Sequence, residues 1–214
     1  MLTVCWAAKG GSGTTVVSCA LALLTAAAHE SSWLVDLAGD VPSALGLAEP
    51  AGPGVHDWVV SSSAPTQAFE SLGVPVSDGL VLIPRGSVVA SGDLGRWAEL
   101  GRFLAAGPTN VVVDAGSWAP PPQFVAAAQQ RLLVTKPCYL ALRRAAASAL
   151  MPTGVIVVHE PGRALRAQDV AYAVQAPVVA EVSTDPAVAR AVDAGLLASR
   201  LPRTLAGALR QLVA

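Results

Sequence analysis

Short runs of aliphatic and β-branched residues recur along this chain, and segments rich in Ala and Leu with helical spacing separate most of them. Several runs are apolar throughout, which is typical of parallel strands that are buried on both faces. Alternation of such strands with helices predicts an α/β fold, a mostly parallel β-sheet of about seven strands with helices on both faces. The expected strands are 2–7, 32–37, 79–84, 110–115, 131–136, 154–159 and 177–182.

The helical spacing predicts seven helices between or after these strands. They are expected at 15–28, 92–105, 121–129, 138–149, 166–175, 186–193 and 204–213. No internal repeat or low-complexity linker interrupts the pattern, so we expect a single domain over residues 1–214.

The segment 38–77 has a different composition, with five prolines among scattered glycines and serines. This composition predicts loop and short helix rather than core. Two stretches within it, "GDVPSALGL" and "GVHDWVV", are expected to form short helical turns. A segment of this kind at the carboxyl end of a sheet is a place for a mobile switch or a partner surface.

Composition excludes several classes of protein. Hydrophobic residues make up 53% of the chain and charged residues 14%, which is enough apolar material for a large core. The formal net charge is −1, so a surface dominated by nucleic-acid electrostatics is not expected. Three distant cysteines, Cys5, Cys19 and Cys138, form no CxxC pair and support neither a disulfide framework nor a zinc site. We interpret Cys5 and Cys19 as core residues.

Cysteine usage fits a reducing cytoplasm. No basic leader precedes an apolar run at the N-terminus, and the longest apolar stretch, 16–28, is too short to cross a bilayer. We therefore expect a cytoplasmic protein whose only membrane contact would be peripheral.

The stretch "WAAKGGSGTTVV", from Trp6 to Val17, joins the first expected strand to the first expected helix. Glycines in such a turn let successive amide N–H groups point inward, and the helix N-terminus adds its positive end. Thr15, in the first helical turn, supplies a hydroxyl suited to Mg²⁺. A glycine-rich turn can also be tight packing alone, but the lysine before it and the threonine pair after it favour a phosphate-binding loop.

The longer stretch "AAKGGSGTTVVSCALAL" resembles the deviant Walker A motif of the ParA/MinD ATPases, whose pattern is KGGxGK[ST]T. "WLVDLAGDVPSALGL" is similar to the second strand and aspartate segment of that family, "NVVVDAGS" to its Walker B strand, and "LLVTKPCYLALRRA" to the strand and helix that follow. The C-terminal "PVVAEVSTDPAVARAVDAGLL" resembles the CpaE/TadZ branch, which is associated with Tad/Flp pilus localisation, with relatives in septum-site determination. The resemblance covers essentially the whole chain and implies a P-loop NTPase fold.

The resemblance also implies a site for ATP and Mg²⁺ in a homodimer. Lys9 would act in trans as a catalytic residue, by reaching the phosphates bound to the partner subunit. The residues implied to bind nucleotide are Lys9, Gly10, Gly11, Ser12, Gly13, Thr14 and Thr15, and those implied to hold Mg²⁺ are Thr15, Asp36 and Asp114. Asp36 and Asp114 can also be read as residues that end a strand and cap a turn.

Two departures from the family pattern predict at most a slow ATPase. Thr14 stands where the second lysine would be, and losing one charge-assisted hydrogen bond costs about 1.5–3 kcal/mol, or roughly one to two decades of affinity. Ala38 stands where an aspartate would orient the attacking water, so hydrolysis should be slow. Asp40 is a candidate to replace the missing aspartate, although its position in the sequence differs from that of the aspartate in the family pattern.

Two further positions bear on nucleotide recognition. His159 and Glu160 occupy the place of an asparagine with a basic neighbour, and that asparagine reads the adenine edge in the family. Lys136, at the end of an expected strand, is either a partial replacement for the missing charge or a plain surface lysine.

The remaining motifs give weaker signals. The spacing of the three histidines, His29, His56 and His159, is not that of metal ligands. The serines at 61–63 lack the GxSxG motif that surrounds a hydrolase nucleophile. The last expected helix has one apolar face, formed by Leu205, Leu209 and Leu212, which suits either core packing or docking on a membrane or partner. A further interpretation is a DNA-facing patch formed by four arginines, Arg143, Arg144, Arg163 and Arg166. No interleaved aromatic residues support this interpretation.

Our leading hypothesis is a degenerate ParA/MinD-like protein that forms a nucleotide-sensitive dimer with weak or no ATP hydrolysis. Through protein–protein contacts it would position a larger assembly, either Tad/Flp pilus machinery or the division septum. It would then be recruited to the pole, the septum or the inner membrane surface. One alternative is a slow cycling positioning ATPase. The other is a nonspecific DNA-binding partition protein, which the balanced charge makes the last choice.

Overall fold

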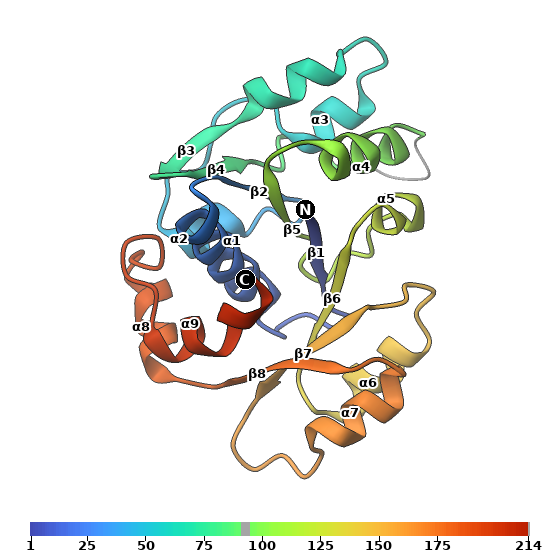
Figure 1. Ribbon diagram of the computed structural model, residues 1–214, viewed down its shortest axis with the longest axis vertical. Coiled ribbons are helices and arrows are strands. Elements are labelled where there is room, and N and C mark those ends of the chain that lie inside the picture. Colours follow the sequence, from blue (N-terminus) through green and yellow to red (C-terminus); the bar gives the residue numbers. More distant parts are fainter. Residues whose placement is uncertain (91–94, 214) are drawn as a thin grey trace.

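A computed structural model describes residues 1–90 and 95–213 of the chain, which form one eight-stranded sheet (Figure 1). The strand order is β3-β4-β2-β5-β1-β6-β7-β8, and every neighbouring pair is parallel except β3 and β4. The strands are β1 (Leu2–Trp6), β2 (Ser32–Asp36), β3 (Val74–Ser77), β4 (Leu80–Ile83), β5 (Asn110–Asp114), β6 (Gln130–Thr135), β7 (Gly154–His159) and β8 (Val178–Ser183). The predicted α/β fold is confirmed, and each of the seven expected strands is found within one residue at either end.

Helices cover both faces of the sheet (Figure 1). One face packs against α3 (Val55–Val60), α4 (Arg96–Ala106), α5 (Pro122–Ala126), α6 (Tyr139–Ala146) and α7 (Ala167–Val174). The other packs against α1 (Thr14–His29), α2 (Val41–Leu45), α8 (Pro186–Asp193) and α9 (Arg203–Leu209). Two 3₁₀ turns, Thr66–Leu72 and Arg210–Leu212, complete the described elements. Of the helix expected over 92–105, positions 92–94 lie outside the described residues, and the remaining range agrees with α4 within one residue at either end.

The two short helices predicted within 38–77 are confirmed as α2 and α3, but the prediction that this segment lies outside the core was wrong. Val55, Trp58 and Phe69 are at most 3% exposed, and the rings of Trp58 and Phe69 meet edge to face at 5.7 Å. The prolines do not prevent this packing, because they lie where no amide donor is needed. Pro42 is in the first turn of α2, and Pro75 is in β3, an antiparallel edge strand that the sequence did not reveal.

The apolar face of the C-terminal helix is buried in the core. Leu205 is 2% exposed and Leu209 is fully buried, in a cluster shared with α1 and β8. Core packing is therefore the correct one of the two interpretations of this helix. Among the described residues, no helix combines the length and the apolarity needed to span a bilayer.

Two turns on the α1 side of the sheet touch through their backbones. Gly46 ends α2 with φ 74°, and a Cβ built on it would lie 2.2 Å from the carbonyl oxygen of Gly195, in the turn that follows α8. No side chain fits between the two turns, so only glycine is compatible with this contact.

His56 joins three loops beneath the carboxyl edge of the sheet. It is 1% exposed and packs against the rings of Trp97 and Trp118, each with its centroid at 5.5 Å. Its Nδ1 accepts the amide N–H of Ala90 at 2.8 Å, so its Nε2 carries the hydrogen that it donates to the carbonyl of Leu37 at 3.1 Å. Burial lowers the pKa of His56 below its ordinary value of 6.5, which keeps the ring neutral.

The pKa of His56 predicts that this ring contributes stability which is lost in acid. Below pH 6.5 the unfolded chain binds a proton that the folded chain does not, so the stability that is present above this pH falls as the pH falls. Urea unfolding measures this contribution as the difference in stability between the wild type and His56→Phe, which should be largest near about pH 8 and shrink toward about pH 5. Protonation of the buried Asp36 and Asp114, whose pKa values are raised to about 7 and about 6, acts in the opposite direction in both proteins. A difference between the two proteins that does not change with pH would contradict the assignment.

Candidate nucleotide site

The loop between β1 and α1 has the geometry of an anion-binding turn. Gly11 and Gly13 adopt φ values of 76° and 87°, a left-handed conformation that favours glycine. The hydroxyl of Ser12 donates to the carbonyl of Lys9 at 2.8 Å and closes the turn. No side chain caps the N-terminus of α1 at Gly13, so the positive end of this sixteen-residue helix remains available to an anion. The residues predicted for the phosphate loop therefore lie together in the expected strand–loop–helix context.

Asp114 lies directly beside this loop. It ends β5 fully buried, and its two carboxylate oxygens accept the hydroxyls of Thr15 at 2.8 Å and Ser18 at 3.0 Å. Ser18 was not predicted as a site residue, although its spacing of three residues from Thr15 places both hydroxyls on one face of α1. Because Thr15 contacts Asp114, two of the three predicted Mg²⁺ ligands meet in the structure.

Asp36, the third predicted ligand, pairs in register with Asp114 across the neighbouring strands β2 and β5. Its carboxylate accepts the backbone amides of Ala38 at 3.0 Å, Gly39 at 2.6 Å and Val41 at 3.2 Å. The side chain therefore fixes the start of the segment that leads into α2. This is the turn-capping role that the sequence left open, and it leaves the carboxylate beside that of Asp114.

The electrostatics of the two aspartates suit a cation. Burial, together with the nearby charge of Asp114, raises the pKa of Asp36 to about 7, although three amide hydrogen bonds act to lower it. Burial likewise raises the pKa of Asp114 to about 6. Neighbouring buried carboxylates are costly to ionise without a positive partner. Oxygen donors from Thr15, Asp36 and Asp114 are the type that Mg²⁺ prefers, so the donor set fits this ion.

Lys9 and Thr14 differ sharply in their surroundings. The Nζ of Lys9 donates only a long bond of 3.4 Å to the carbonyl of Gly10, and it forms no ion pair with any residue in 1–90 or 95–213. Thr14, at the position of the usual second lysine, is 5% exposed. The loop thus has one weakly held cation and a neutral side chain where a second cation would stand.

Arg85 adds a cation that the sequence analysis missed. It follows β4, and its Nη1 donates to the carbonyl of Ala38 at 3.3 Å. Its guanidinium would lie 3.0 Å from a Cβ on Gly39. The signal that could have found it is its place at the carboxyl end of the strand beside β2. At position 38 the structure therefore has an alanine methyl group with an arginine at its carbonyl.

A pocket of about 280 Å³ opens beside the phosphate loop, between the start of α1 and the ends of β7 and β8. Gly13, Val16, Val158 and Val182 form an apolar part of its wall, of a kind suited to a nucleotide base. His159 does not line the pocket and instead pairs with Glu181 at 2.6 Å.

Lys136 lines the same pocket, but its charge is already paired. Its Nζ contacts Glu160 at 2.5 Å, and Arg163 contacts the other carboxylate oxygen at 2.7 Å. Hydrogen bonds from Lys136 and Arg163 lower the pKa of Glu160 to about 2. Lys136 is therefore a partly exposed lysine held in an ion pair, and its role as a partial replacement for the missing charge stays a prediction.

No protein-family model matches the chain, and no curated protein sequence matches it. Solved structures do match. The ParA family ATPase of Chlorobium tepidum is 17% identical with a TM-score of 0.77, over 99% of this chain and 97% of that chain. MinD of Pyrococcus horikoshii, complexed with Mg-ADP, is 17% identical with a TM-score of 0.76, over 100% of this chain and 95% of that one. The MinC:MinD complex of Aquifex aeolicus matches at 19% identity and a TM-score of 0.77, over 99% and 94%. The chain thus has the fold of the ParA and MinD ATPases, as predicted, while the CpaE/TadZ branch stays a prediction.

Proposed function

We propose that this chain binds ATP with Mg²⁺ in its phosphate loop, forms a nucleotide-sensitive homodimer and positions a larger assembly through protein–protein contacts. The proposal rests on the combination of a loop whose backbone amides remain available to phosphate, beside two buried aspartates, with two missing groups. Thr14 stands in place of a cation, and Ala38 stands in place of an acidic side chain. The proposed assembly is Tad/Flp pilus machinery or the division septum. Hydrolysis is weak or absent.

Nucleotide binding is supported by the parts of the site that remain complete. The left-handed glycines and the uncapped start of α1 provide donors for phosphate oxygens. Thr15, Asp36 and Asp114 would hold Mg²⁺, which neutralises phosphate charge when it is bound. The P. horikoshii MinD of the same fold was solved with Mg-ADP, in line with this chemistry.

Slow hydrolysis is supported by the surroundings of Ala38. A methyl group cannot orient a water molecule, and the neighbouring Arg85 is a donor that does not accept a proton. Asp40 is exposed at the start of α2 and makes no capping hydrogen bond with its side chain. A slow cycling ATPase is the second candidate, favoured by the weakly held Lys9, which is available to a partner subunit.

DNA binding is the third candidate and has less support. Of the four arginines interpreted as a DNA-facing patch, Arg163 is paired with Glu160. Arg143 and Arg144 lie in the last turn of α6, and Arg166 precedes α7. A steep dependence of DNA affinity on salt concentration is the sign that this candidate requires.

Lys9→Ala tests the proposed dimer. We expect ATP with Mg²⁺ to release heat in calorimetric titration and to double the mass of the wild-type protein in light scattering. Lys9→Ala should abolish the doubling, because the variant lacks the cation that would contact nucleotide in the partner subunit. Arg102→Ala, which removes a charge from the exposed side of α4, should dimerise like the wild type. Absence of heat would contradict nucleotide binding, and an unchanged dimer in Lys9→Ala would contradict the role of this residue.

A further inference from the structure

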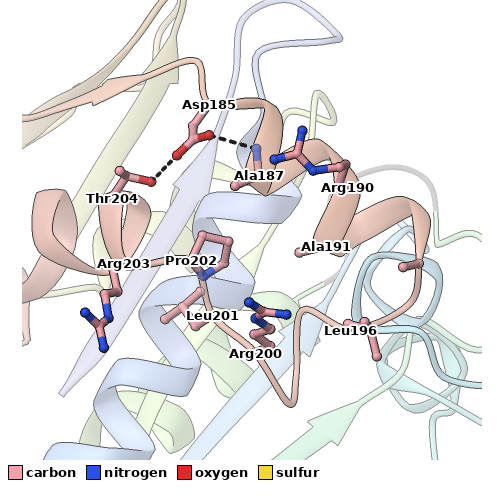
Figure 2. Close-up of a pocket in the computed structure, with 11 residues that line it drawn as sticks. Asp185, Ala187, Arg190, Ala191, Leu196, Arg200, Leu201, Pro202, Arg203 and Thr204 are labelled. Carbon is pink, nitrogen blue, oxygen red and sulfur yellow. Dashed lines mark hydrogen bonds between the residues drawn. The ribbon is translucent and has the colours of Figure 1, made fainter.

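A second and larger concavity, of about 790 Å³, lies between α8 and α9, outside the phosphate loop (Figure 2). We call it the arginine groove, because Arg190, Arg200 and Arg203 line it. Arg190 extends from α8, whereas Arg200 and Arg203 flank Leu201 and Pro202 on the segment that enters α9 (Figure 2). Three cations from two elements therefore line one concave surface.

The three arginines keep their hydrogen-bonding capacity for a ligand. All three are exposed, and none of their side chains forms a hydrogen bond or a close ion pair within the described part of the chain. The one carboxylate in the groove, Asp185, is already engaged: it accepts the amide of Ala187 at 2.7 Å and the hydroxyl of Thr204 at 2.6 Å. The pKa of Asp185 is lowered mainly by the hydrogen bond from Thr204, and the charge of Arg190 helps to lower it. The groove thus has a surplus of positive charge with free guanidinium donors.

The rest of the groove is largely apolar. Ala191, Leu201 and Pro202 contribute to its lining, and Leu196, which is 45% exposed, lies at its edge. A ligand that fills this surface must offer aliphatic groups as well as anionic ones. Guanidinium groups bind carboxylates through paired hydrogen bonds, so side-chain carboxylates provide the matching anions.

We propose that the arginine groove binds a segment of a partner polypeptide in which acidic side chains alternate with small aliphatic ones. Duplex DNA fits less well, because its convex phosphate surface would leave the apolar lining without a partner, and no aromatic side chain lines the groove for stacking on bases. That the partner belongs to the positioned assembly rests on the proposed function, whereas the binding of an acidic segment does not.

Helix α8 forms a wall of both concavities. Val188, Val192 and Asp193 line the pocket beside the phosphate loop, and Arg190, Ala191 and Ala194 line the arginine groove. A partner segment and a nucleotide would therefore contact opposite sides of one helix. This link, like the nucleotide itself, rests on the proposed function, so the test of the groove is made without nucleotide.

The test selects ligands from displayed random peptides of about twelve residues on the nucleotide-free, full-length protein. The selected peptides are then synthesised, and their binding is measured by fluorescence anisotropy. We expect them to be rich in Asp and Glu between Ala, Val or Leu, and to bind more weakly at high salt. The triple variant Arg190→Ala, Arg200→Ala and Arg203→Ala should lose about 30-fold or more in affinity, and each single variant about threefold to tenfold.

A matched variant separates the groove from general charge. Arg102→Ala, Arg143→Ala and Arg144→Ala together remove the same charge from α4 and α6, and should stay within about twofold of wild-type affinity. Circular dichroism checks that both triple variants fold, as expected for exposed arginines whose side chains form no hydrogen bond with a described residue. Calorimetry with ATP should give the same result for the groove variant and the wild type, so a failure of the groove is distinguished from a failure of nucleotide binding.

Three results would overturn the proposal. In the first, the selected peptides show no enrichment of acidic residues. In the second, they bind the groove variant as tightly as the wild type. In the third, a short DNA duplex binds more tightly than any selected peptide and loses this binding in the groove variant, which would identify a nucleic-acid surface instead.

Discussion

Replacing Thr14 with lysine should raise the affinity for ATP with Mg²⁺ about tenfold to a hundredfold. The expected gain is that of one charge-assisted hydrogen bond to a phosphate oxygen, at the position where the KGGxGK[ST]T pattern has its second lysine. Hydrolysis should stay slow in this variant, because Ala38 still provides no group to orient water. Calorimetric titration measures the affinity, and phosphate release measures the turnover.

The double variant Thr14→Lys and Ala38→Asp separates binding from chemistry. A carboxylate at position 38 should raise turnover by about a hundredfold over Thr14→Lys alone, within the usual range for a positioned acid–base group. Thr14→Met is the matched control, since it adds a long stem without charge and should not raise affinity. Equal affinity in Thr14→Lys and Thr14→Met would contradict the idea that a missing cation limits binding.

Gly13→Val should reduce nucleotide affinity by more than about a hundredfold. Gly13 has a φ of 87° and is the N-cap of α1, and a β-branched residue strongly resists this conformation. The strain is in the backbone rather than in packing, because a Cβ at this position would have its nearest neighbour, Val158, at 4.0 Å. Relief of the strain must turn the inward-facing amides away from the phosphates, and non-glycine residues in this region cost about 1–2 kcal/mol or more.

Gly10→Ala is the control for this prediction. Gly10 has no positive φ, and a Cβ there would meet Ser117 at an ordinary contact distance of 3.7 Å. Nucleotide affinity and thermal stability should therefore remain close to those of the wild type. If Gly13→Val binds ATP within tenfold of the wild type, phosphate recognition does not depend on these amides.

Features contained in one continuous stretch could be predicted from the sequence. Buried parallel strands are uninterrupted apolar runs, so their positions were found within one residue. The phosphate loop is likewise continuous, and Asp36 and Asp114 each end such a run. The residues proposed for the nucleotide site could therefore be named before the structure was known.

Features that depend on distant contacts could not be predicted. Phe69 is surrounded by Trp33, Trp58 and Phe103, and the proline content of 38–77 conceals this role. Arg85 reaches the carbonyl of Ala38 only because β4 lies beside β2. Strand order also determines which loop ends meet, and the spacing of residues along the chain does not contain it.

The arginine groove depends on tertiary structure in the same way. Arg190 and Arg203 lie on different helices, and their sequence context gives no sign that they face one concavity. The bond between Asp185 and Thr204 joins the start of α8 to α9 and helps to form this surface.

The backbone contact between Gly46 and Gly195 links the segment held by Asp36 to the edge of the arginine groove. Where a side chain lies between two helices, it can change rotamer when one helix shifts. Where two backbones are in direct contact, as here, no side chain is available to adjust, so a shift of one backbone moves the other. The amides held by Asp36 lead into α2, α2 ends at Gly46, and Gly195 precedes Leu196 at the edge of the arginine groove. Any tilt of α2 toward α8 must therefore displace that edge as well, so a change in what Asp36 binds can alter the shape of a surface on the far side of α8.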